Sequence, residues 1–491
     1  MAFKLIYTDV ALGAANDAEI TAATPEEFCA PDKIPFGVYT GAVATCEPNA
    51  WGLTHTYKVK DKQPFAFWSI ERSGEGGVFE QPPALLIEFT EQYTSTGLTF
   101  RFSPDANEYC SEIFVAWYQD GAIKESGYFY PNNGEYALEN TVEAFDQVAV
   151  AFTKTNLPHR RVKLEYVAIG IIREFDGSEL TDAKCVHEID LISDTVPINV
   201  LDASFHSSTD AEFMFQKKQP VEAYNGTDLV GVYYIESGER ISARNYSISC
   251  HDAIGVLELD AYNGGLYLTD TPLETICDDV LGGAFAVEID AAYANTTLRG
   301  YIPPGTKREA LRHIGFALGA CIDTTGTFNI KIFPPSVGKG VEIPKTETYI
   351  GGKVTTTDIV TAVSVVSYEI VDKRPEDGDE AIEINGVEYK YTSDIATATN
   401  PNVSVGTLPN ALTFDGCYLI NSTNAQERAD NILAYYMRRN TYSAKHIVRG
   451  QNMADRSVVH LPWDDVKTGN IIKMTITATA ITASDTEFLL D

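Results

Sequence analysis

Short runs in which apolar and polar residues alternate dominate the first third of the chain. A period of two buries one face of a β-strand and leaves the other in water, and residues 98–102 show it most clearly. Further strand-like runs lie at 85–89, 113–118, 148–152 and 163–169. Turn-forming residues separate the runs at 103–105, 120–121 and 131–134. Many short strands with almost no helical period predict a mainly β fold, and residues 1–172 are predicted to form a jelly-roll sandwich.

The next two regions differ in their patterns. Residues 173–260 are predicted to form a small β-barrel, with strand-like runs at 211–215, 231–235 and 246–250. Residues 261–338 carry helix signals and predict a small α+β domain, which ends in a strand over 328–333.

Two capping boxes support the helices of that α+β domain. Thr271-Pro272-Leu273-Glu274 and Thr306-Lys307-Arg308-Glu309 each predict a helix start, the first with Pro at the first helical position. In the second helix an apolar stripe is formed by Leu311, Ile314 and Leu318, with Ala310 and Ala317 beside it. Gly319 predicts the end of that helix.

Residues 339–491 return to strand patterns and predict a second barrel with one long helix. A strand over 362–371 precedes an acidic tract at 372–380, predicted to be a solvated loop, and a hairpin over 382–391 that turns at Asn385-Gly386. The helix is predicted over 425–439, with Ala429, Ile432, Leu433 and Tyr436 inward and Arg438-Arg439 at its C-terminal end. The last strands are predicted at 443–449, 457–461 and 471–481.

The boundary near residue 172 is fixed only to within about ten residues by these patterns. The first strands belong either to the sandwich or to the first barrel. In the second case the sandwich is an insertion into the barrel.

The charge of the chain limits its partners. Lys and Arg number 37 against 69 Asp and Glu, a formal net charge of −32, which argues against coating nucleic acid or docking on anionic lipid.

No run reaches the roughly 18 apolar residues of a membrane span, and the N-terminus is a poor signal peptide, so we expect no membrane insertion.

The eight cysteines form no CxxC or zinc pattern. We expect mostly reduced, semi-buried thiols at 29, 46, 110, 185, 250, 277, 321 and 417.

Catalytic motifs are missing from the sequence. It has no HExxH, G-x-S-x-G or Walker loop, and Gly338-Lys339-Gly340 is interpreted as a loop with a lysine. His251-Asp252 and His187-Glu188 are candidate catalytic pairs, but a capping or core histidine is the favoured interpretation of each. No pair of acids stands out from its neighbours as a glycoside hydrolase pair would. We therefore predict no catalytic, cofactor-binding or metal-binding residue, no cofactor and no enzymatic activity.

Two features of the first domain could bind a ligand. Trp51, Trp68, Trp117 and Tyr118 are candidates for stacking on sugar rings, although core packing is favoured for Trp117, which lies in the middle of a strand. The acidic loop 103–108 is a candidate calcium site, but an ordinary solvated turn is favoured.

Several segments resemble the hub proteins of phage tails, of the late-control-protein type. Tyr234-Ile235 matches a strand of the first hub barrel, and Asp252-Ala253-Ile254-Gly255-Val256-Leu257 matches its "D-A-I-x-x-L" strand-to-helix corner. The stretch from Gly300 to Leu311 matches a "G-x-I-P-x-x-T-x-R-E-A-L" element that opens a helix. The resemblance extends over residues 231–240, 246–257, 262–267 and 298–320.

The N-terminal region resembles the discoidin-like jelly roll that is fused to this hub in many prophage tails of Gram-positive hosts. The residues that carry this likeness are 98–103, 117–118, 129–131 and 152–164. The region after 339 matches the hub only in its β-helix-β order.

The resemblance implies a virion structural protein of a phage tail, baseplate or tail-like bacteriocin particle, made in the bacterial cytoplasm. Such hubs are homotrimers in which each subunit gives two small barrels, so that a pseudo-sixfold ring joins the tail tube to a spike, needle or tip. Baseplate wedge or peripheral proteins lie outside the ring, and genomic DNA passes through the lumen, which an acidic lining would keep free of bound phosphate. The chain ends after the second predicted barrel, so we expect any lytic domain or spike on a separate protein.

Two other functions remain as alternatives. The first is a carbohydrate-binding tail protein that recognises the host surface through its jelly roll. The second, and the least favoured, is a polysaccharide-degrading enzyme.

Overall fold

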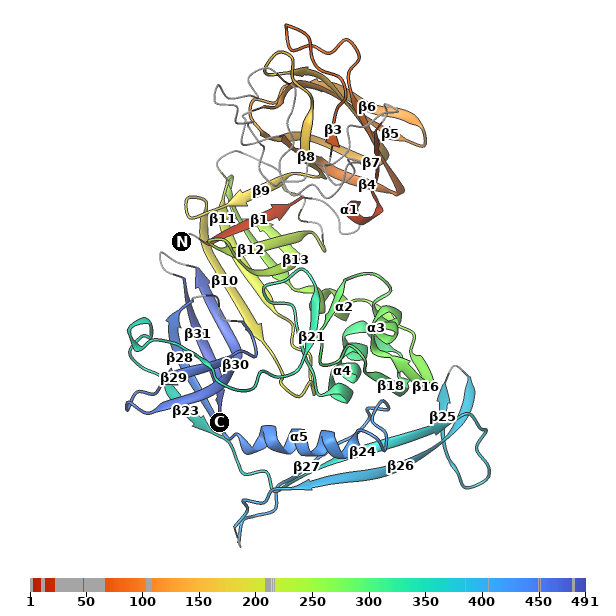
Figure 1. Ribbon diagram of the computed structural model, residues 1–491, viewed down its shortest axis with the longest axis vertical. Coiled ribbons are helices and arrows are strands. Elements are labelled where there is room, and N and C mark those ends of the chain that lie inside the picture. The colour runs from red at the N-terminus through yellow and green to blue at the C-terminus, as the bar shows by residue number, and fades with distance from the viewer. Residues whose placement is uncertain are drawn as a thin grey trace. The chain divides into compact units, whose positions relative to one another are not determined.

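A computed structural model describes residues 3–9, 14–22, 47, 67–102, 108–207, 213, 215, 217–384, 386–404, 406–448, 450, 452–478 and 482–491. The structure is mainly β, as the sequence pattern predicts, and it divides into two compact units (Figure 1). Unit 1 comprises Met1–Leu5, Phe175–Asp210 and Val221–Asp491, and unit 2 comprises Ile6–Glu174 and Ala211–Pro220. Because unit 1 holds both ends of the chain, unit 2 is an insertion in it. The sequence pattern allows the first strand to belong either to the sandwich or to the first barrel. In the structure that strand begins in unit 1.

Unit 2 is built on one curled sheet. Its strands follow the order β3-β8-β4-β7-β5-β6, and β2 pairs with β4. The elements of the unit are α1 (Ala14–Asp17), β2 (Glu19–Ala22), β3 (Phe67–Trp68), β4 (Ala84–Phe102), β5 (Cys110–Gln119), β6 (Ala122–Phe129), β7 (Glu135–Thr155) and β8 (Lys163–Ile169). A two-residue turn at Asp120-Gly121 joins β5 to β6, as predicted. The chain enters unit 2 within β1 (Phe3–Thr8) and returns to unit 1 within β9 (Ile172–Phe175), and Ala211–Pro220 is a second, short segment of unit 2.

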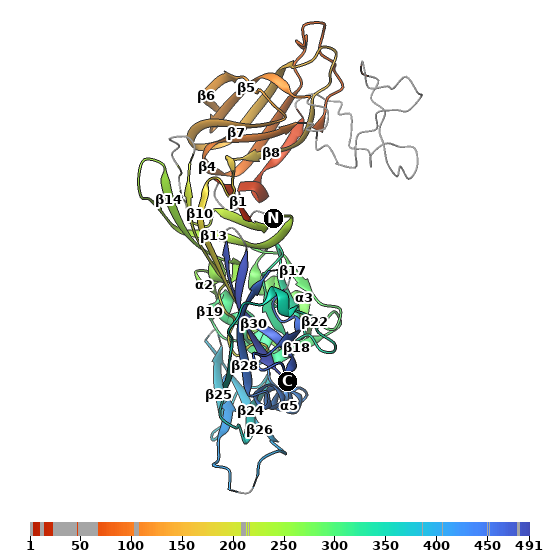
Figure 2. The same cartoon turned by 90° about the vertical axis from the view of Figure 1, so that its left-hand side faces the viewer.

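Two long strands make the sheet of unit 2 curl. The predicted strands 85–89 and 98–102 are the two ends of the single strand β4, and 148–152 is only part of β7. Register shifts between β4 and β7 from Glu88 to Gly97 bend both strands, as bulges do (Figure 2). The core lies inside the curl, and Trp117 is fully buried in it, which confirms the core interpretation of that residue.

Unit 1 contains a large sheet with the path β23-β28-β31-β30-β10-β11-β14-β13-β12-β1. Its further strands are β10 (Leu180–Glu188), β11 (Val200–His206), β12 (Pro220–Asn225), β13 (Asp228–Arg240), β14 (Asn245–His251), β22 (Val341–Glu342), β23 (Lys353–Thr356), β28 (Asn440–Ile447), β29 (Arg456–His460), β30 (Val466–Ala478) and β31 (Ala483–Leu490). Strand β10 pairs antiparallel with both β11 and β30. One continuous sheet therefore joins strands from the two regions that the sequence pattern predicts as separate barrels. The predicted strand 211–215 lies mostly outside the described residues.

The segment between β14 and β22 is a small α+β part of unit 1. It contains α2 (Ala253–Glu258), β15 (Ala261–Tyr262), β16 (Gly265–Pro272), α3 (Leu273–Leu281), β17 (Val287–Ile289), β18 (Thr297–Ile302), β19 (Gly305–Thr306), α4 (Lys307–Leu318), β20 (Cys321–Asp323) and β21 (Ile330–Phe333). Helix α4 has the predicted capping box at Thr306 and Glu309 and ends at Gly319 in the left-handed conformation.

The capping box predicted at Thr271 is wrong. Pro272 is the N-cap of α3 rather than its first helical residue, and no side chain caps the helix. Thr271 and Pro272 instead end strand β16, where they pair with Leu298 and Thr297 of β18. Sheet pairing therefore places Thr271 in an extended strand rather than at the N-cap.

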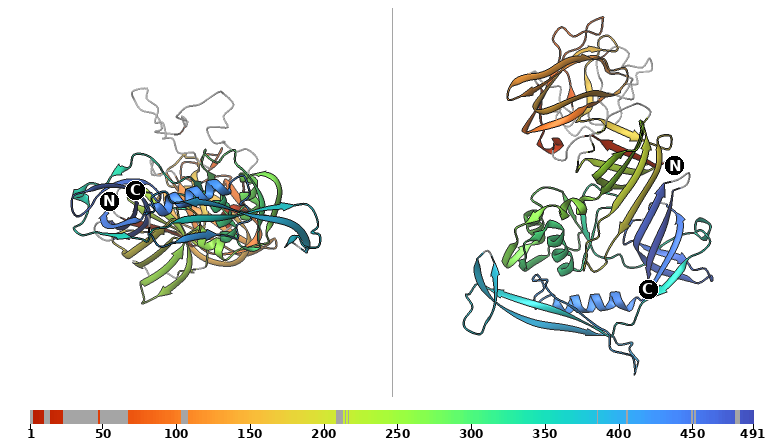
Figure 3. Two further views of the ribbon diagram at one scale, coloured as in Figure 1. Left: turned by 90° about the horizontal axis from the view of Figure 1, so that it is seen from below. Right: turned by 180° about the vertical axis from the view of Figure 1, so that it is seen from behind.

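A four-stranded sheet with the order β25-β26-β24-β27 carries the long helix (Figure 3). Its elements are β24 (Ala362–Val371), β25 (Glu380–Ile384), β26 (Val387–Thr399), β27 (Ala411–Phe414) and α5 (Ala425–Met437), and a 3-10 turn, η2 (Lys345–Glu347), precedes it. The tract 372–379 is an exposed loop, as predicted. The hairpin pairs Ile384 with Val387; Asn385 of its predicted turn lies outside the described residues.

Helix α5 ends two residues before its predicted end. Ala429, Ile432 and Leu433 are buried, as the apolar stripe predicts. Arg438 is the C-cap residue, and its guanidinium donates to the carbonyl oxygen of Leu489. The basic end predicted to interact with the helix dipole therefore also binds the C-terminal strand β31.

Candidate functional site

The corner where β14 leads into α2 holds a buried carboxylate. Asp252 is the N-cap of α2, and its Oδ1 accepts a hydrogen bond of 3.1 Å from the backbone N–H of Gly255. Its Oδ2 accepts a bond of 2.6 Å from the hydroxyl of Thr324. A Cβ at position 255 would overlap the ring of His251, so only glycine fits at this place in the "D-A-I-x-x-L" corner.

A second carboxylate lies beside this corner. Asp323, at the end of β20, is buried and accepts a hydrogen bond from the Thr325 hydroxyl. The side-chain amide of Asn199 donates to the Thr324 hydroxyl at 3.2 Å. Burial raises the pKa of Asp252 to about 7, although the Thr324 and Gly255 hydrogen bonds lower it, and burial also raises the pKa of Asp323. This cluster joins the loop after β20 to the start of α2.

His187 and Glu188 do not act as a pair. His187 is buried, and its Nε2 contacts the hydroxyl of Tyr233. Burial lowers the pKa of His187 to about 4, so the ring is neutral at pH 7. Glu188 forms an ion pair with Lys473. The favoured interpretation of His187 as a core histidine is confirmed.

His251 and Asp252 also point to different partners. The Nδ1 of His251 lies 3.7 Å from Oε2 of the exposed Glu236, whereas Asp252 bonds to Gly255 and Thr324. Asp252 rather than His251 is the cap, and His251 is buried, which confirms the core interpretation of that histidine.

A cavity of about 470 Å³ lies within unit 1 next to His187. Met453, Met474 and Ile476 give it apolar walls, and Asn225 and Asp228 bring polar groups to it. Such a lining suits an apolar group with one polar end.

Metal and thiol chemistry find no support within the described ranges. No group of three or more His, Cys, Asp or Glu side chains in them could hold a metal ion. Six cysteines there are free and buried: 110, 185, 250, 277, 321 and 417. Burial raises the pKa of Cys185 to about 12, for example, so these thiols stay protonated and unreactive. They are reduced, as predicted, but buried rather than semi-buried.

The raised pKa of Asp252 predicts a pH-dependent stability. Its folded-state pKa of about 7 lies above the roughly 3.9 of an unfolded Asp, so the folded state binds the extra proton. The contribution to stability is complete below pH ~4 and is lost as the pH rises towards about 7. We expect the melting temperature of the wild type to fall over this range more steeply than that of Asp252→Asn, which keeps the cap.

The control for this prediction is Asp176→Asn. Asp176 is exposed, and its hydrogen bonds to Ser178 lower its pKa, so this variant should not flatten the pH profile. Parallel profiles for the wild type and Asp252→Asn would contradict the prediction.

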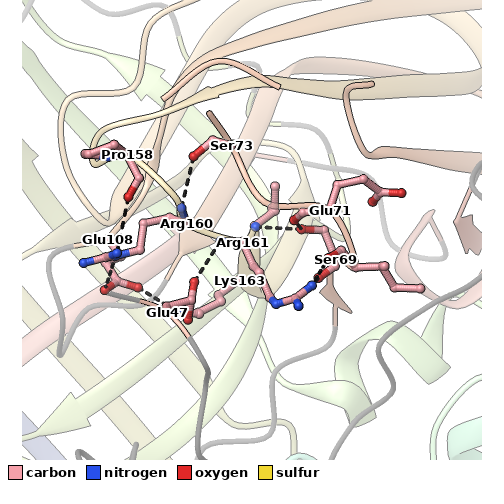
Figure 4. A network of polar contacts seen from close by, with 11 residues as sticks. Glu47, Ser69, Glu71, Ser73, Glu108, Pro158, Arg160, Arg161 and Lys163 are labelled. Carbon is pink, nitrogen blue, oxygen red and sulfur yellow. Dashed lines mark hydrogen bonds and ion pairs between the residues drawn. The ribbon is translucent and has the colours of Figure 1, made fainter. Parts of the chain in front are cut away.

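Unit 2 contains a network of buried charges (Figure 4). Lys163 begins β8, and its ammonium lies 2.6 Å from a carboxylate oxygen of Glu47 and 2.6 Å from one of Glu108. Arg160 donates from Nε to the other oxygen of Glu108 at 3.0 Å. The backbone N–H of Arg161 donates to Glu47 at 2.8 Å. The network ties Glu47 and Glu108, which are distant in sequence, to the start of β8.

Several predicted ligand-binding residues fall outside the part of the chain that the structure describes, namely Trp51, residues 103–107 and the side chain of Trp68. Tyr118 is half-buried on the side of β5 that faces away from the core. Glu108, the last residue of the predicted calcium loop, is bound by Lys163 and Arg160.

Sequence reasoning missed both charge clusters. Their partners come from distant parts of the chain: Asp252 with Thr324, and Lys163 with Glu47. One local signal was available, because Lys163 stands between Val162 and Leu164, which are both buried. A lysine within an apolar strand needs a buried partner.

No helix among the described residues is long and apolar enough to cross a membrane.

Comparison with known proteins gives matches in structure. No family model matches the chain, and no curated protein matches its sequence. A tail protein from Neisseria meningitidis MC58 is similar with a TM-score of 0.47 and 13% identity, over 65% of this chain and 94% of that one. The 43 kDa tail protein of prophage MuSo2 from Shewanella oneidensis is similar with a TM-score of 0.43 and 12% identity, over 65% and 95%. The prophage tail protein gp18 from Listeria monocytogenes EGD-e is similar with a TM-score of 0.44 and 9% identity, over 64% and 91%.

Proposed function

We propose that this chain is the structural hub of a phage tail or tail-like particle. Three copies would form a pseudo-sixfold ring that joins the tail tube on one face to the spike or needle on the other. Baseplate proteins would lie outside the ring. The resemblance supports this, because its segments fall on a single part of the structure, namely β13, the β14–α2 corner and the stretch from β18 to α4.

The observation that carries the proposal is the pairing of β10 with β30. Six residue pairs, from Ala183↔Ala478 to Glu188↔Lys473, join the strands of two regions into one sheet. A pseudo-sixfold ring made of three chains needs two similar groups of strands in each chain, held at a fixed distance from each other. A continuous hydrogen-bonded sheet gives that fixed distance, since strands pair at about 4.8 Å.

The charge of the chain suits a conduit for DNA. With a net charge of −32, an acidic surface turned to the lumen would repel the phosphates of the genome and let it pass. With this charge, apolar and hydrogen-bonding surfaces would make the contacts with the tube and the spike.

The mass of the purified full chain tests the proposal. Light scattering should give three times the chain mass of 53.8 kDa, and averaged particle images from the same peak should show a ring with a central hole. The mass should hold when the sample is diluted, because an obligate ring buries large interfaces. A monomer at every concentration, with no ring in the images, would contradict the hub.

A further inference from the structure

The cavity of about 470 Å³ in unit 1 lies against the buried face of the seam between β10 and β30 (Figure 1). His187 lies directly opposite Met474, and Cys185 lies opposite Ile476, so these four buried side chains share one face of the two strands. All of them except Cys185 line the cavity. Its other walls come from the hairpin of β12 and β13, the turn between β20 and β21, and the connection between β28 and β29. Segments from both sides of the seam therefore surround one space.

Two buried polar side chains in the cavity wall have unused hydrogen-bonding groups. Asn225 ends β12 on the same face as the inward-pointing Val221 and Ala223, and it is only 9% exposed. Its side-chain amide forms no hydrogen bond within the described part of the chain. His187 contacts the Tyr233 hydroxyl through Nε2, and its Nδ1 has no partner among the same residues. Buried polar groups are nearly always hydrogen-bonded, so these two need a partner inside the cavity.

The charges around the cavity favour a ligand with a neutral head group. No lysine or arginine of the described residues lines it, so an anion would find no counter-charge there. Asp228, the carboxylate among its lining residues, is exposed and would repel an anion further. Asn225 and His187 are both neutral at pH 7, so a buried cation would also lack a counter-ion. A hydroxyl or an amide, which can donate and accept hydrogen bonds, suits both side chains.

The apolar part of the cavity suits an alkyl chain. Met453, Met474 and Ile476 are each at most 3% exposed, and flexible methionine side chains adapt to different ligand shapes. An apolar cavity of about 150 Å³ holds one benzene molecule, so each non-hydrogen atom of a ligand needs about 25 Å³. At that ratio the cavity holds a ligand of about 19 non-hydrogen atoms. Such a ligand would displace water from the apolar walls, which is favourable.

We propose that this cavity binds a neutral amphiphile with a single alkyl chain, of the monoacylglycerol type. Its hydroxyl groups would bond to the Asn225 amide and to Nδ1 of His187. Its alkyl chain would pack on Met453, Met474 and Ile476. Because the walls come from both sides of the β10–β30 seam, the bound amphiphile would hold the two groups of strands together.

This inference concerns unit 1 alone and does not depend on the hub. A trimer that binds no amphiphile and a monomer that binds one are therefore separate results.

Titration calorimetry of the full chain with monoacylglycerols, each below its aggregation concentration, tests the proposal. Glycerol monolaurate has about the number of atoms that the cavity holds, and it should bind at least about tenfold more tightly than the shorter glycerol monocaprylate. Glycerol monomyristate is too long and should gain nothing further, whereas non-specific adsorption would strengthen with every added methylene. Lauric acid, the anionic control, should bind at least about tenfold more weakly than glycerol monolaurate.

Two variants place the binding in the cavity. Asn225→Ala removes the unpaired amide and should weaken the binding of glycerol monolaurate about tenfold. Ile476→Phe fills part of the apolar space and should weaken glycerol monolaurate more than glycerol monocaprylate. Asn402→Ala is the matched control, since Asn402 is exposed and lies beyond the end of β26, and it should bind as the wild type does. Hydrogen exchange of the wild type should slow in β10 and β30 when glycerol monolaurate is bound.

Three results would overturn the proposal. The first is that no monoacylglycerol binds, which would leave water as the occupant of the cavity. The second is an affinity that keeps rising with chain length or is equal for lauric acid. The third is equal affinity of the Asn225→Ala and Asn402→Ala variants for glycerol monolaurate. Asn225→Ala and Ile476→Phe test the cavity independently, so either one decides if the other does not fold.

Discussion

Replacing Lys163 with methionine is expected to destabilise unit 2 by about 3–5 kcal/mol, because it leaves the buried carboxylate of Glu47 without its cation and removes one of the two cations at Glu108. The side chain of Lys163 is 2% exposed and that of Glu47 only 1%, so water cannot replace the lost ammonium. Methionine fills most of the volume of the lysine, and the loss therefore reports the charge rather than a cavity. Glu108 keeps Arg160, so we expect Glu47 to lose its ion pair while Glu108 retains one.

Urea unfolding combined with hydrogen exchange measures this effect in the full chain. The amides of β8 should lose protection in Lys163→Met while those of β30 in unit 1 keep theirs. Lys345→Met is the control, because its ion pair with Asp464 is exposed, with side chains 67% and 77% accessible, and should leave the free energy of unfolding nearly unchanged. If both variants behave alike, the buried network does not stabilise unit 2.

A double variant separates charge from packing. Adding Glu47→Gln to Lys163→Met removes the unpaired charge of Glu47, while Glu108 keeps Arg160, and should recover part of the lost stability. If the two substitutions only add their losses, the harm comes from altered packing and not from buried charge.

Replacing Gly300 with alanine is expected to destabilise unit 1 by about 3 kcal/mol or more, because the new methyl group meets backbone atoms and the backbone conformation favours glycine. Gly300 has φ of 135°, and a Cβ there would overlap the carbonyl oxygen of Tyr418. The same carbonyl accepts the N–H of Tyr301 at 3.3 Å, so the two segments cannot simply move apart. Gly300 opens the "G-x-I-P" element of the hub resemblance, and this contact explains why a glycine stands there.

Gly283→Ala is the matched control for that prediction. Gly283 also has a positive φ, 77°, but a Cβ there would meet nothing within 4 Å. It should lose only the roughly 1–2 kcal/mol of the left-handed conformation. Urea unfolding measures the free energy of unfolding of both variants. Equal losses would show that the Tyr418 carbonyl moves aside for the methyl group.

Local patterns predicted the elements whose signals are complete within a few residues. Strand β8 has the predicted bounds of 163–169, and β24 those of 362–371, because each is a run rich in apolar residues that stops before a glycine or an aspartate. Helix α4 was predicted from its capping box and its glycine, since both act on backbone groups of the same turn. The same reasoning failed at Thr271, where pairing with Leu298 of β18 outweighs the local cap.

The β class, most of the strands, and helix α4 with its cap can be predicted from the order of the amino acids alone, and so can the resemblance to tail hubs. The pairing of β10 with β30 across nearly 300 residues, and the insertion of unit 2 into unit 1, emerge only in the folded chain. Folding alone brings Lys163 to Glu47, and Asp252 to Thr324. The physical reason is that hydrogen-bond patterns and side-chain periods act over a few residues, whereas strand pairing and buried charges join partners that only the folded core selects.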